Sequence, residues 1–306
     1  MVHVKNENAP GGTRPEFSVV IPTCGRPEAL AACLARLAKG AQTFAGDYEV
    51  IVSDDAPPPG AVAELGKLFP WVRWVEGPHR GPAANRNHGA RQARGLWLVF
   101  TDDDCLPDLN WLAAYAKGRR ENPAARVLEG RTYADRPRRS DRETAPLNET
   151  GGCLWSCNFA IENALFRELG GFDERFPHAT MEDMDFAERL REGGLAFPFI
   201  PAAAVCHPWK IFNGPAVSEK HVPALLYFLQ LHPARRQHHS LFRYARMLAR
   251  GFLWDLPRLV LIGKWDLLPQ CWHSNCGVFH IVCGLLRRPK ATAARPSGPT
   301  PWPALE

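Results

Sequence analysis

The sequence predicts an α/β fold with a mostly parallel central sheet, followed by a helical C-terminal extension. Up to about residue 207, short β-branched apolar runs alternate with segments of helical periodicity, which is typical of a parallel sheet covered by helices. Beyond that point the composition becomes basic, aromatic and helical in pattern. A chain of 306 residues with 45% hydrophobic composition can bury one sizeable core.

The first hundred residues contain four expected strands, each a short apolar run that ends in turn residues. These strands are expected at residues 17–22, 48–55, 71–77 and 96–101. Apolar residues at helical spacing predict helices around residues 30–37, 61–69 and 82–94. The second strand ends in Asp54 and Asp55, and the fourth ends directly in Asp102, Asp103 and Asp104.

The middle of the chain begins with an Arg-rich polar stretch, residues 126–150, which we interpret as a flexible loop. Residues 151–172 predict a strand and a short helix that ends at Gly170-Gly171. A helix is expected at 182–194, with Thr180 as a possible N-cap in a capping box, and the last strand at 196–207.

Composition divides the chain into four parts. We expect a disordered tail at 1–16, the α/β domain at 17–207, a helical basic subdomain at 208–290 and a proline-rich tail at 291–306. Residues 1–207 carry 24 Lys+Arg against 28 Asp+Glu, whereas residues 208–306 carry 13 against 4. With its tryptophans, the basic segment suits peripheral contact with a membrane, and packing against the α/β domain or a partner is the alternative. We expect no nucleic-acid partner.

The N-terminal sequence has no apolar core of signal-peptide length, so no cleaved signal is expected. No stretch reaches the roughly 18 to 20 apolar residues of a membrane-spanning helix. We therefore expect a cytoplasmic protein with its nine cysteines as thiols, in peripheral contact with the cytoplasmic face of the membrane.

The aspartates at the strand ends are the candidate functional residues. Ligands of parallel α/β sheets bind outside the carboxyl ends of the strands. Three adjacent carboxylates repel one another unless a cation lies among them, and hard oxygen ligands suit Mg²⁺ or Mn²⁺, which would neutralise a diphosphate. A solvated acidic turn is the alternative for either cluster taken alone.

Asp183 lies at the start of a predicted helix, where the helix dipole favours the ionised carboxylate that a general base requires. The capping box is the structural alternative. Trp155 suits stacking on a ligand, although an aromatic residue there also suits the core.

Six segments occur in the order seen in family 2 glycosyltransferases of the GT-A fold. They are VVIPTCGRP, IVSDDAP, NRNHGARQARG, LVFTDDDCLP, SCNFAIENALFRELGGFDERF and MEDMDFAERLREGG. Over roughly residues 17–207 the chain resembles that family. The resemblance implies a Rossmann-like sandwich and an inverting transfer from a nucleotide-sugar, often a UDP-sugar, to a carbohydrate or lipid-linked acceptor, with Mn²⁺ or Mg²⁺ as cofactor.

The resemblance also implies roles for individual residues. The donor-binding residues it implies are Pro22, Thr23, Arg26, Asp54, Asp55, Arg86, Asp102 and Asp103. The metal ligands it implies are Asp102, Asp104 and His207, where Asp104 is the main contact and Asp102 lies nearer the ribose. Asp183 is the implied catalytic base, and Trp155, Asn158 and Glu182 are placed at the acceptor.

Two rival functions fit the same fold. A nucleotidyltransferase would need a Gly-rich, Lys-bearing loop after the first strand, and TCGRP is not one. A non-catalytic nucleotide-sugar or polysaccharide-binding protein would need no base, so the combination of Asp183 with Asp102-x-Asp104 favours an enzyme.

Overall fold

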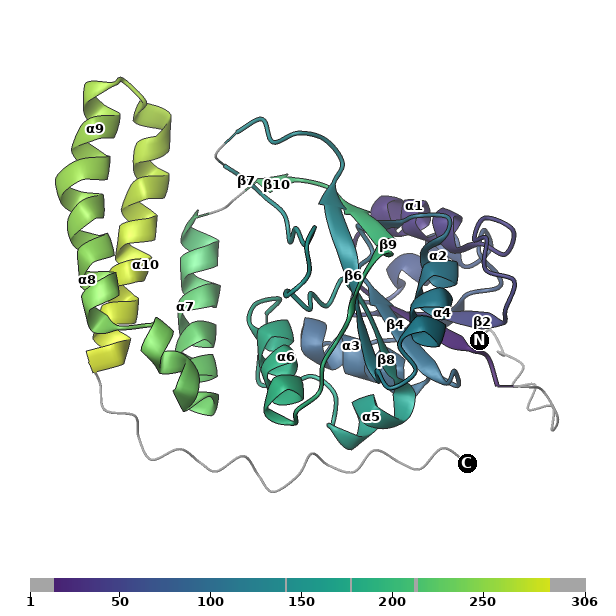
Figure 1. The fold of residues 1–306 in the computed structure, drawn as a ribbon. Helices are drawn as coiled ribbons and strands as arrows, with labels where there is room; N and C mark the ends of the chain where they lie inside the picture. The colour runs from purple at the N-terminus through teal and green to yellow at the C-terminus, as the bar shows by residue number, and fades with distance from the viewer. Residues whose placement is uncertain (1–13, 141, 177, 212–213, 287–306) are drawn as a thin grey trace.

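The computed structural model describes residues 14–140, 142–176, 178–211 and 214–286, which form an α/β domain and a group of C-terminal helices (Figure 1). Of the tails expected at 1–16 and 291–306, only residues 14–16 are among those described. There, Glu16 donates a backbone hydrogen bond to Asp47, and Pro15 accepts one from Leu96. These two residues therefore belong to the folded domain.

The central sheet has eight strands in the order β3-β2-β1-β4-β8-β6-β9-β5. Their bounds are β1 Phe17–Thr23, β2 Tyr48–Asp54, β3 Arg73–Glu76, β4 Trp97–Thr101, β5 Leu106–Pro107, β6 Val127–Ala134, β8 Asn158–Glu162 and β9 Phe199–His207. Strands β1 to β4 pair in parallel, as do β6 and β9, while β8 runs antiparallel to β4 and β6, and β5 to β9. The prediction of a mostly parallel sheet is confirmed.

Helices cover both faces of this sheet (Figure 1). One face packs against α1 Pro27–Leu37, α2 Gly60–Leu65 and α4 Trp111–Glu121. The other packs against α3 Pro82–Arg91, α5 Asn163–Glu168 and α6 Glu182–Glu192. This second core includes a cluster of five aromatic rings in contact, mostly tilted or edge to face: Phe100, Phe159, Phe166, Phe172 and Phe186.

The expected loop at 126–150 is wrong over its first part, because residues 127–134 form the inner strand β6. Its residues Val127 to Gly130 are buried between β8 and β9, so burial on both faces outweighs the polar sequence. Further along, β7 Glu143–Thr144 pairs with β10 Lys210–Ile211. The α/β domain therefore extends beyond the predicted boundary at residue 208.

Two helix boundaries also differ from expectation. Helix α2 ends at Leu65, before Gly66, and not at residue 69. The N-cap of α6 is Met181 and not Thr180, whose hydroxyl pairs instead with His221 at 2.9 Å. Met181 has a φ of 68°, a left-handed conformation that a non-glycine residue adopts only when its surroundings hold it.

The C-terminal helices form a third cluster beside the α/β domain (Figure 1). They comprise α7 Gly214–Leu231, η1 Pro233–His238, α8 Leu241–Arg250, η2 Gly251–Asp255, α9 Leu256–Leu261, η3 Trp265–Leu267 and α10 Leu268–Leu286. Phe176 and Met181 of the α/β domain are buried in this cluster with Phe228 and Leu225 of α7. Within the described part of the chain, no helix combines the length and apolarity needed to cross a membrane.

Candidate active site

The carboxyl ends of β1, β2 and β4 meet at one edge of the sheet, because these three strands are adjacent and parallel. Thr23, Asp54 and Thr101 are the last residues of these strands. Asn85 of α3 donates its side-chain amide to the carbonyl oxygens of Thr23 (3.2 Å) and Ser53 (2.9 Å). The amide therefore ties the ends of β1 and β2 together.

Asp103, the middle residue of the triplet, faces the protein. Its side chain is fully buried. It accepts a hydrogen bond from the Thr23 hydroxyl at 2.6 Å and forms an ion pair with Arg26 at 2.5 Å. Burial raises the pKa of Asp103 to about 6, although Arg26 and Thr23 oppose the rise. In this arrangement Asp103 fixes the loop after β1.

Asp104 is surrounded by basic groups. Its Oδ2 pairs with Lys210 at 2.7 Å and with Arg26 at 2.5 Å, and its Oδ1 lies 3.6 Å from Nε2 of His207. Burial alone would raise the pKa of Asp104, but Lys210, His207 and Arg26 outweigh it and hold the pKa below its usual value. Asp104 is therefore ionised at neutral pH, as a metal ligand must be.

The residues around Asp104 fit a divalent cation. Among the described residues, one group of potential ligands lies close enough to share an ion: Asp104, Cys105 and His207. The buried Oδ1 of Asp104 has no hydrogen-bond partner. His207 donates its Nδ1 proton to the carbonyl of Pro208 at 2.7 Å, which leaves the lone pair of Nε2 directed toward Asp104. Burial lowers the pKa of His207, so the ring is neutral at pH 7.

Arg86 links the two halves of the site. It is buried in α3 and pairs with Asp102 at 2.7 Å on one side and with Glu182 at 3.0 Å on the other. Burial and the neighbouring Asp183 raise the pKa of Glu182 to about 7, against the opposing effect of Arg86. One guanidinium therefore sets the position of the triplet at β4 relative to the start of α6.

Asp183, the predicted base, is half-buried in the first turn of α6. Its Oδ1 accepts the backbone N–H of Met184 at 2.8 Å. Burial raises the pKa of Asp183, while Arg86 and hydrogen bonds from the backbone of Met184 and Ser156 lower it. A carboxylate whose pKa is raised above its usual value is a stronger base once ionised, which suits proton abstraction.

Asp54 and Asp55 lie at the end of β2, but their carboxylates are already bonded to the backbone. Asp54 is buried and accepts the N–H groups of Ala56 (2.9 Å) and Ala61 (2.6 Å), so it caps the turn into α2. Asp55 is half-buried and accepts the N–H groups of His79 (2.9 Å) and Gly81 (3.2 Å). Pro22 lies inside β1, opposite Ser53.

The three residues predicted at the acceptor occupy different environments. The buried amide of Asn158 donates to the carbonyl oxygens of Arg131 (2.7 Å) and Ala203 (3.0 Å) and accepts from Trp111 (2.8 Å) and Tyr115 (2.7 Å).

Glu182 is buried and pairs with Arg86 at 3.0 Å. Trp155 is half-buried against the core, and its indole N–H bonds to Leu147 at 3.1 Å.

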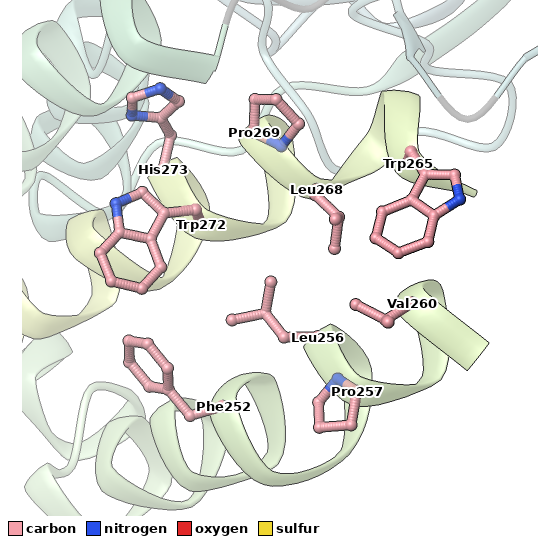
Figure 2. Close-up of a pocket in the computed structure, with 9 residues that line it drawn as sticks. All are labelled: Phe252, Leu256, Pro257, Val260, Trp265, Leu268, Pro269, Trp272 and His273. Atoms are coloured by element: carbon pink, nitrogen blue, oxygen red, sulfur yellow. The ribbon is translucent and has the colours of Figure 1, made fainter. Parts of the chain in front are cut away.

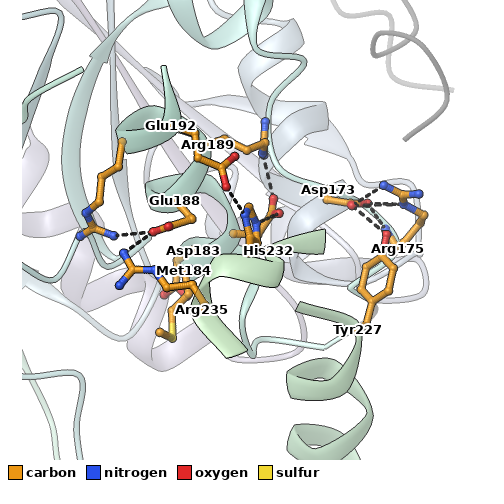
Figure 3. Close-up of polar contacts among 12 residues, drawn as sticks. Asp173, Arg175, Asp183, Met184, Glu188, Arg189, Glu192, Tyr227, His232 and Arg235 are labelled. Carbon is orange, nitrogen blue, oxygen red and sulfur yellow. Dashed lines mark hydrogen bonds and ion pairs between the residues drawn. The ribbon is translucent and has the colours of Figure 1, made fainter. Parts of the chain in front are cut away.

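The sequence did not predict two contacts: one that the segment before the C-terminal helices makes with Asp104, and one that these helices make with α6. Lys210 contacts Asp104 from β10, in a segment that carries no recognisable motif. His232 contacts α6 from the end of α7: its ring nitrogens lie 2.9 Å from Asp185 and 2.8 Å from Glu192 (Figure 3).

Two further polar contacts join the C-terminal helices to the α/β domain. Arg235 of η1 pairs with Glu188, and Tyr227 of α7 donates to Asp173 at 3.0 Å (Figure 3). The helix that begins with Glu182 and Asp183 is therefore held from its outer side by the C-terminal helices.

We expect the stability of this contact to depend on pH through His232. Burial disfavours its charged form, but the bonds with Asp185 and Glu192 outweigh burial and raise its pKa. The stabilisation is therefore complete below the unfolded pKa of about 6.5 and is lost as pH rises through the folded pKa. His232→Gln should lower the free energy of unfolding by about 1 to 3 kcal/mol at about pH 6 and by less at about pH 8.

Denaturant unfolding across this pH range checks the prediction, with His238→Gln as the control because His238 is exposed on the same 3₁₀ turn. Parallel pH curves for the wild type and His232→Gln would contradict it.

Comparison with known proteins agrees with this architecture. The model of the family described as Glycosyl transferase family 2 matches residues 18–180. Glycosyltransferase AglE of Haloferax volcanii is 33% identical over 217 residues, which cover 66% of this chain and 69% of that protein. An uncharacterized glycosyltransferase of Haemophilus influenzae is 28% identical over 57% of this chain, and the match spans 61% of its own length.

Among solved structures, residues 1–349 of S. aureus TarS in complex with UDP superpose with a TM-score of 0.53. The superposition covers 88% of this chain and 90% of that one at 16% identity, which supports the fold alone. The match to the family model covers more than half of the chain and includes both the loop after β1 and the aspartate triplet. The chain belongs to glycosyltransferase family 2.

Proposed function

We propose that this protein transfers a sugar from a nucleoside-diphosphate sugar to an acceptor hydroxyl, with inversion at the anomeric carbon. The observation that carries the proposal is the pairing of Arg86 with both Asp102 and Glu182. Asp183, the candidate base, follows Glu182 directly, so the buried guanidinium keeps the donor-side carboxylate and the base close together. A protein that only binds a nucleotide-sugar has no use for a base in that position.

The donor diphosphate is proposed to bind at the carboxyl ends of β1 and β4. Arg26 is half-exposed and is available to a diphosphate oxygen once it leaves Asp104, and Lys210 lies beside it. UDP is the first nucleotide to test, because TarS, which shares the fold, has been solved with UDP. Asp102, whose side chain is partly exposed, lies on the outer side of the triplet, where a ribose hydroxyl can reach it.

The acceptor reaction is assigned to Asp183. Its carboxylate takes the proton of the acceptor hydroxyl while the oxygen attacks the anomeric carbon from the face opposite the leaving diphosphate. A single displacement of this kind inverts the configuration. A carbohydrate or a lipid-linked glycan is the class of acceptor we propose.

Asp104 and His207 are proposed to hold a Mn²⁺ or Mg²⁺ ion, and Cys105 lies next to them. When bound, such an ion neutralises charge on the leaving diphosphate. Lys210 and Arg26 now occupy Asp104 Oδ2, so their release accompanies loading of the site.

Calorimetry with UDP checks the metal role. We expect UDP to bind in Mn²⁺ and its affinity to fall by about tenfold or more in excess EDTA, because the diphosphate then lacks the cation that neutralises its charge. His207→Ala should weaken the Mn²⁺-dependent part of the affinity by about tenfold to a hundredfold, as loss of a ligand or its support does elsewhere.

His238→Ala is the matched control for His207→Ala, since His238 is an exposed histidine of η1 and lies outside the ligand group. Equal UDP affinity with Mn²⁺ and with EDTA would contradict the metal role and leave the transfer proposal to be tested through Asp183.

A further inference from the structure

The far end of the C-terminal helices exposes a group of large apolar side chains. We call this region the hairpin tip and define it as residues 252–272, from η2 through α9 and the turn to the start of α10. Leu253 is 78% exposed, Leu261 86%, and Trp254 and Trp265 62% each. Figure 1 shows that the end of α9 lies away from the sheet, so the α/β domain does not cover these side chains.

An apolar groove runs between the two arms of the hairpin tip. It has a volume of about 740 Å³ and is lined by side chains from η2, α9, η3 and α10 that include Phe252, Val260, Trp265 and Trp272. Figure 2 shows these side chains facing one another across an open gap. The rings of Phe252 and Trp272 meet edge to face at 5.6 Å. The groove thus adds recessed apolar surface to the projecting side chains.

Exposed cations lie among the apolar residues of the tip and on the preceding turn. Arg250, Arg258 and Lys264 are all exposed. Asp255 and Asp266 are the acidic residues of this stretch, and Asp255 pairs weakly with Arg250 at 3.5 Å. Helix α8, which leads into the tip, adds exposed Arg243 and Arg246. The tip therefore combines apolar and positively charged groups in one exposed surface.

We propose that the hairpin tip docks the protein on an anionic membrane surface without spanning it. Leu253 and Leu261 enter the apolar region, and Trp254 and Trp265 lie at the headgroup level, where an indole keeps its N–H hydrated. Arg250, Arg258 and Lys264 pair with lipid phosphates. This inference concerns membrane binding and stands independently of the transfer reaction.

Two features favour a lipid surface over a second copy of this chain. A symmetric contact through the tip would bring Arg250, Arg258 and Lys264 close to their own copies, and like charges repel. Exposed Leu261 and Ile262 also lie directly before Gly263, whose φ is 70°, so the apolar surface extends to the turn at the projecting end. A fluid lipid layer can surround such an end, whereas a preformed protein surface would need a matching cavity.

Vesicle co-sedimentation of the full chain tests the proposal. The wild type should bind vesicles of phosphatidylcholine with about 30% phosphatidylglycerol at low salt, and bind pure phosphatidylcholine far less, because anionic lipid attracts basic residues. The triple variant Arg250→Gln/Arg258→Gln/Lys264→Gln should lose about a hundredfold in partition coefficient, since each basic residue contributes about fivefold. Trp254→Ser/Leu261→Ser should lose about a hundredfold on both kinds of vesicle.

Leu68→Ser is the matched control, because Leu68 is 69% exposed on the α/β domain, away from the tip, and its loss should leave binding unchanged. Thermal melts of all variants confirm folding, and quenching of tryptophan emission by brominated lipid reports insertion directly.

The proposal is overturned by absence of wild-type binding at low salt or by unchanged binding of Trp254→Ser/Leu261→Ser. It is also overturned if sedimentation velocity without lipid shows a dimer that this variant dissociates.

Discussion

Asp183→Asn should reduce sugar transfer by about 10²- to 10⁴-fold while leaving the affinity for UDP nearly intact. The variant keeps the size of the side chain but cannot take a proton, and general-base catalysis contributes about 10²- to 10⁴-fold to a rate. Donor binding should persist because the donor-side groups Asp102, Asp104 and Arg26 are untouched, and Arg86 retains both of its partners.

The pH profile gives the same prediction a second readout. Burial raises the pKa of Asp183 above its usual value, so the wild-type rate should fall as pH drops through that raised pKa. Residual transfer by Asp183→Asn should lack this decrease. Initial rates of UDP release with a glycan acceptor, measured beside calorimetry, check both points.

Asp47→Asn serves as the control for Asp183→Asn because Asp47 is exposed and pairs with the exposed Lys39, far from the strand ends. Comparable transfer by Asp183→Asn and the wild type would remove Asp183 as the base. Loss of UDP affinity in the same variant would show that Asp183 acts on donor binding.

Arg86→Met should be the most destabilising single change in the site. Arg86 is buried and compensates Asp102 and Glu182, so its removal leaves carboxylates without a cation. Removing one partner of a buried ion pair lowers the free energy of unfolding by about 3 to 5 kcal/mol. The loss should be larger at about pH 8 than at about pH 6, because Glu182, whose pKa is already raised to about 7, escapes the penalty by binding a proton at lower pH.

The double variant Arg86→Met/Glu182→Gln separates charge from packing. It removes one of the two unpaired carboxylates and should recover a substantial part of the lost stability, together with the pH dependence. Denaturant unfolding measures all three proteins. Arg80→Met is the control, since Arg80 is 60% exposed and pairs with Glu174, and an exposed pair contributes about 0 to 1 kcal/mol. An Arg86→Met variant as stable as Arg80→Met would contradict the bridging role of Arg86.

The contact between α6 and the C-terminal helices gives these helices a place in the site. Met181, the left-handed residue directly before Glu182, is buried among side chains of α7 and α10, and His232 and Arg235 bind the outer side of α6. Because a left-handed non-glycine residue persists only where packing holds it, the C-terminal cluster contributes to the position of Asp183.

Much of the fold could be predicted from periodicity. The strands at 17–23, 48–54 and 97–101 and the helix faces of α1 and α6 are confirmed, because a buried strand and an amphipathic helix each leave a local pattern. Strand β6 was missed because its sequence, VLEGRTYA, is polar in half of its residues and is buried only by its neighbours β8 and β9. Membership of the family followed from the order of several motifs, and the match to residues 18–180 confirms it.

The sequence by itself determined the residue types of the site and the strand ends that carry them, because Asp102 to Asp104 follow an apolar run and Asp183 begins a helix. Only the tertiary structure decided what each side chain does. In the folded protein Asp103 bonds to Thr23, and Asp54 caps the turn into α2. The amide of Asn158 is bonded within the core, and Lys210 pairs with Asp104. The physical reason is that a hydrogen bond depends on distance and direction between residues far apart in the chain, which local sequence patterns do not record.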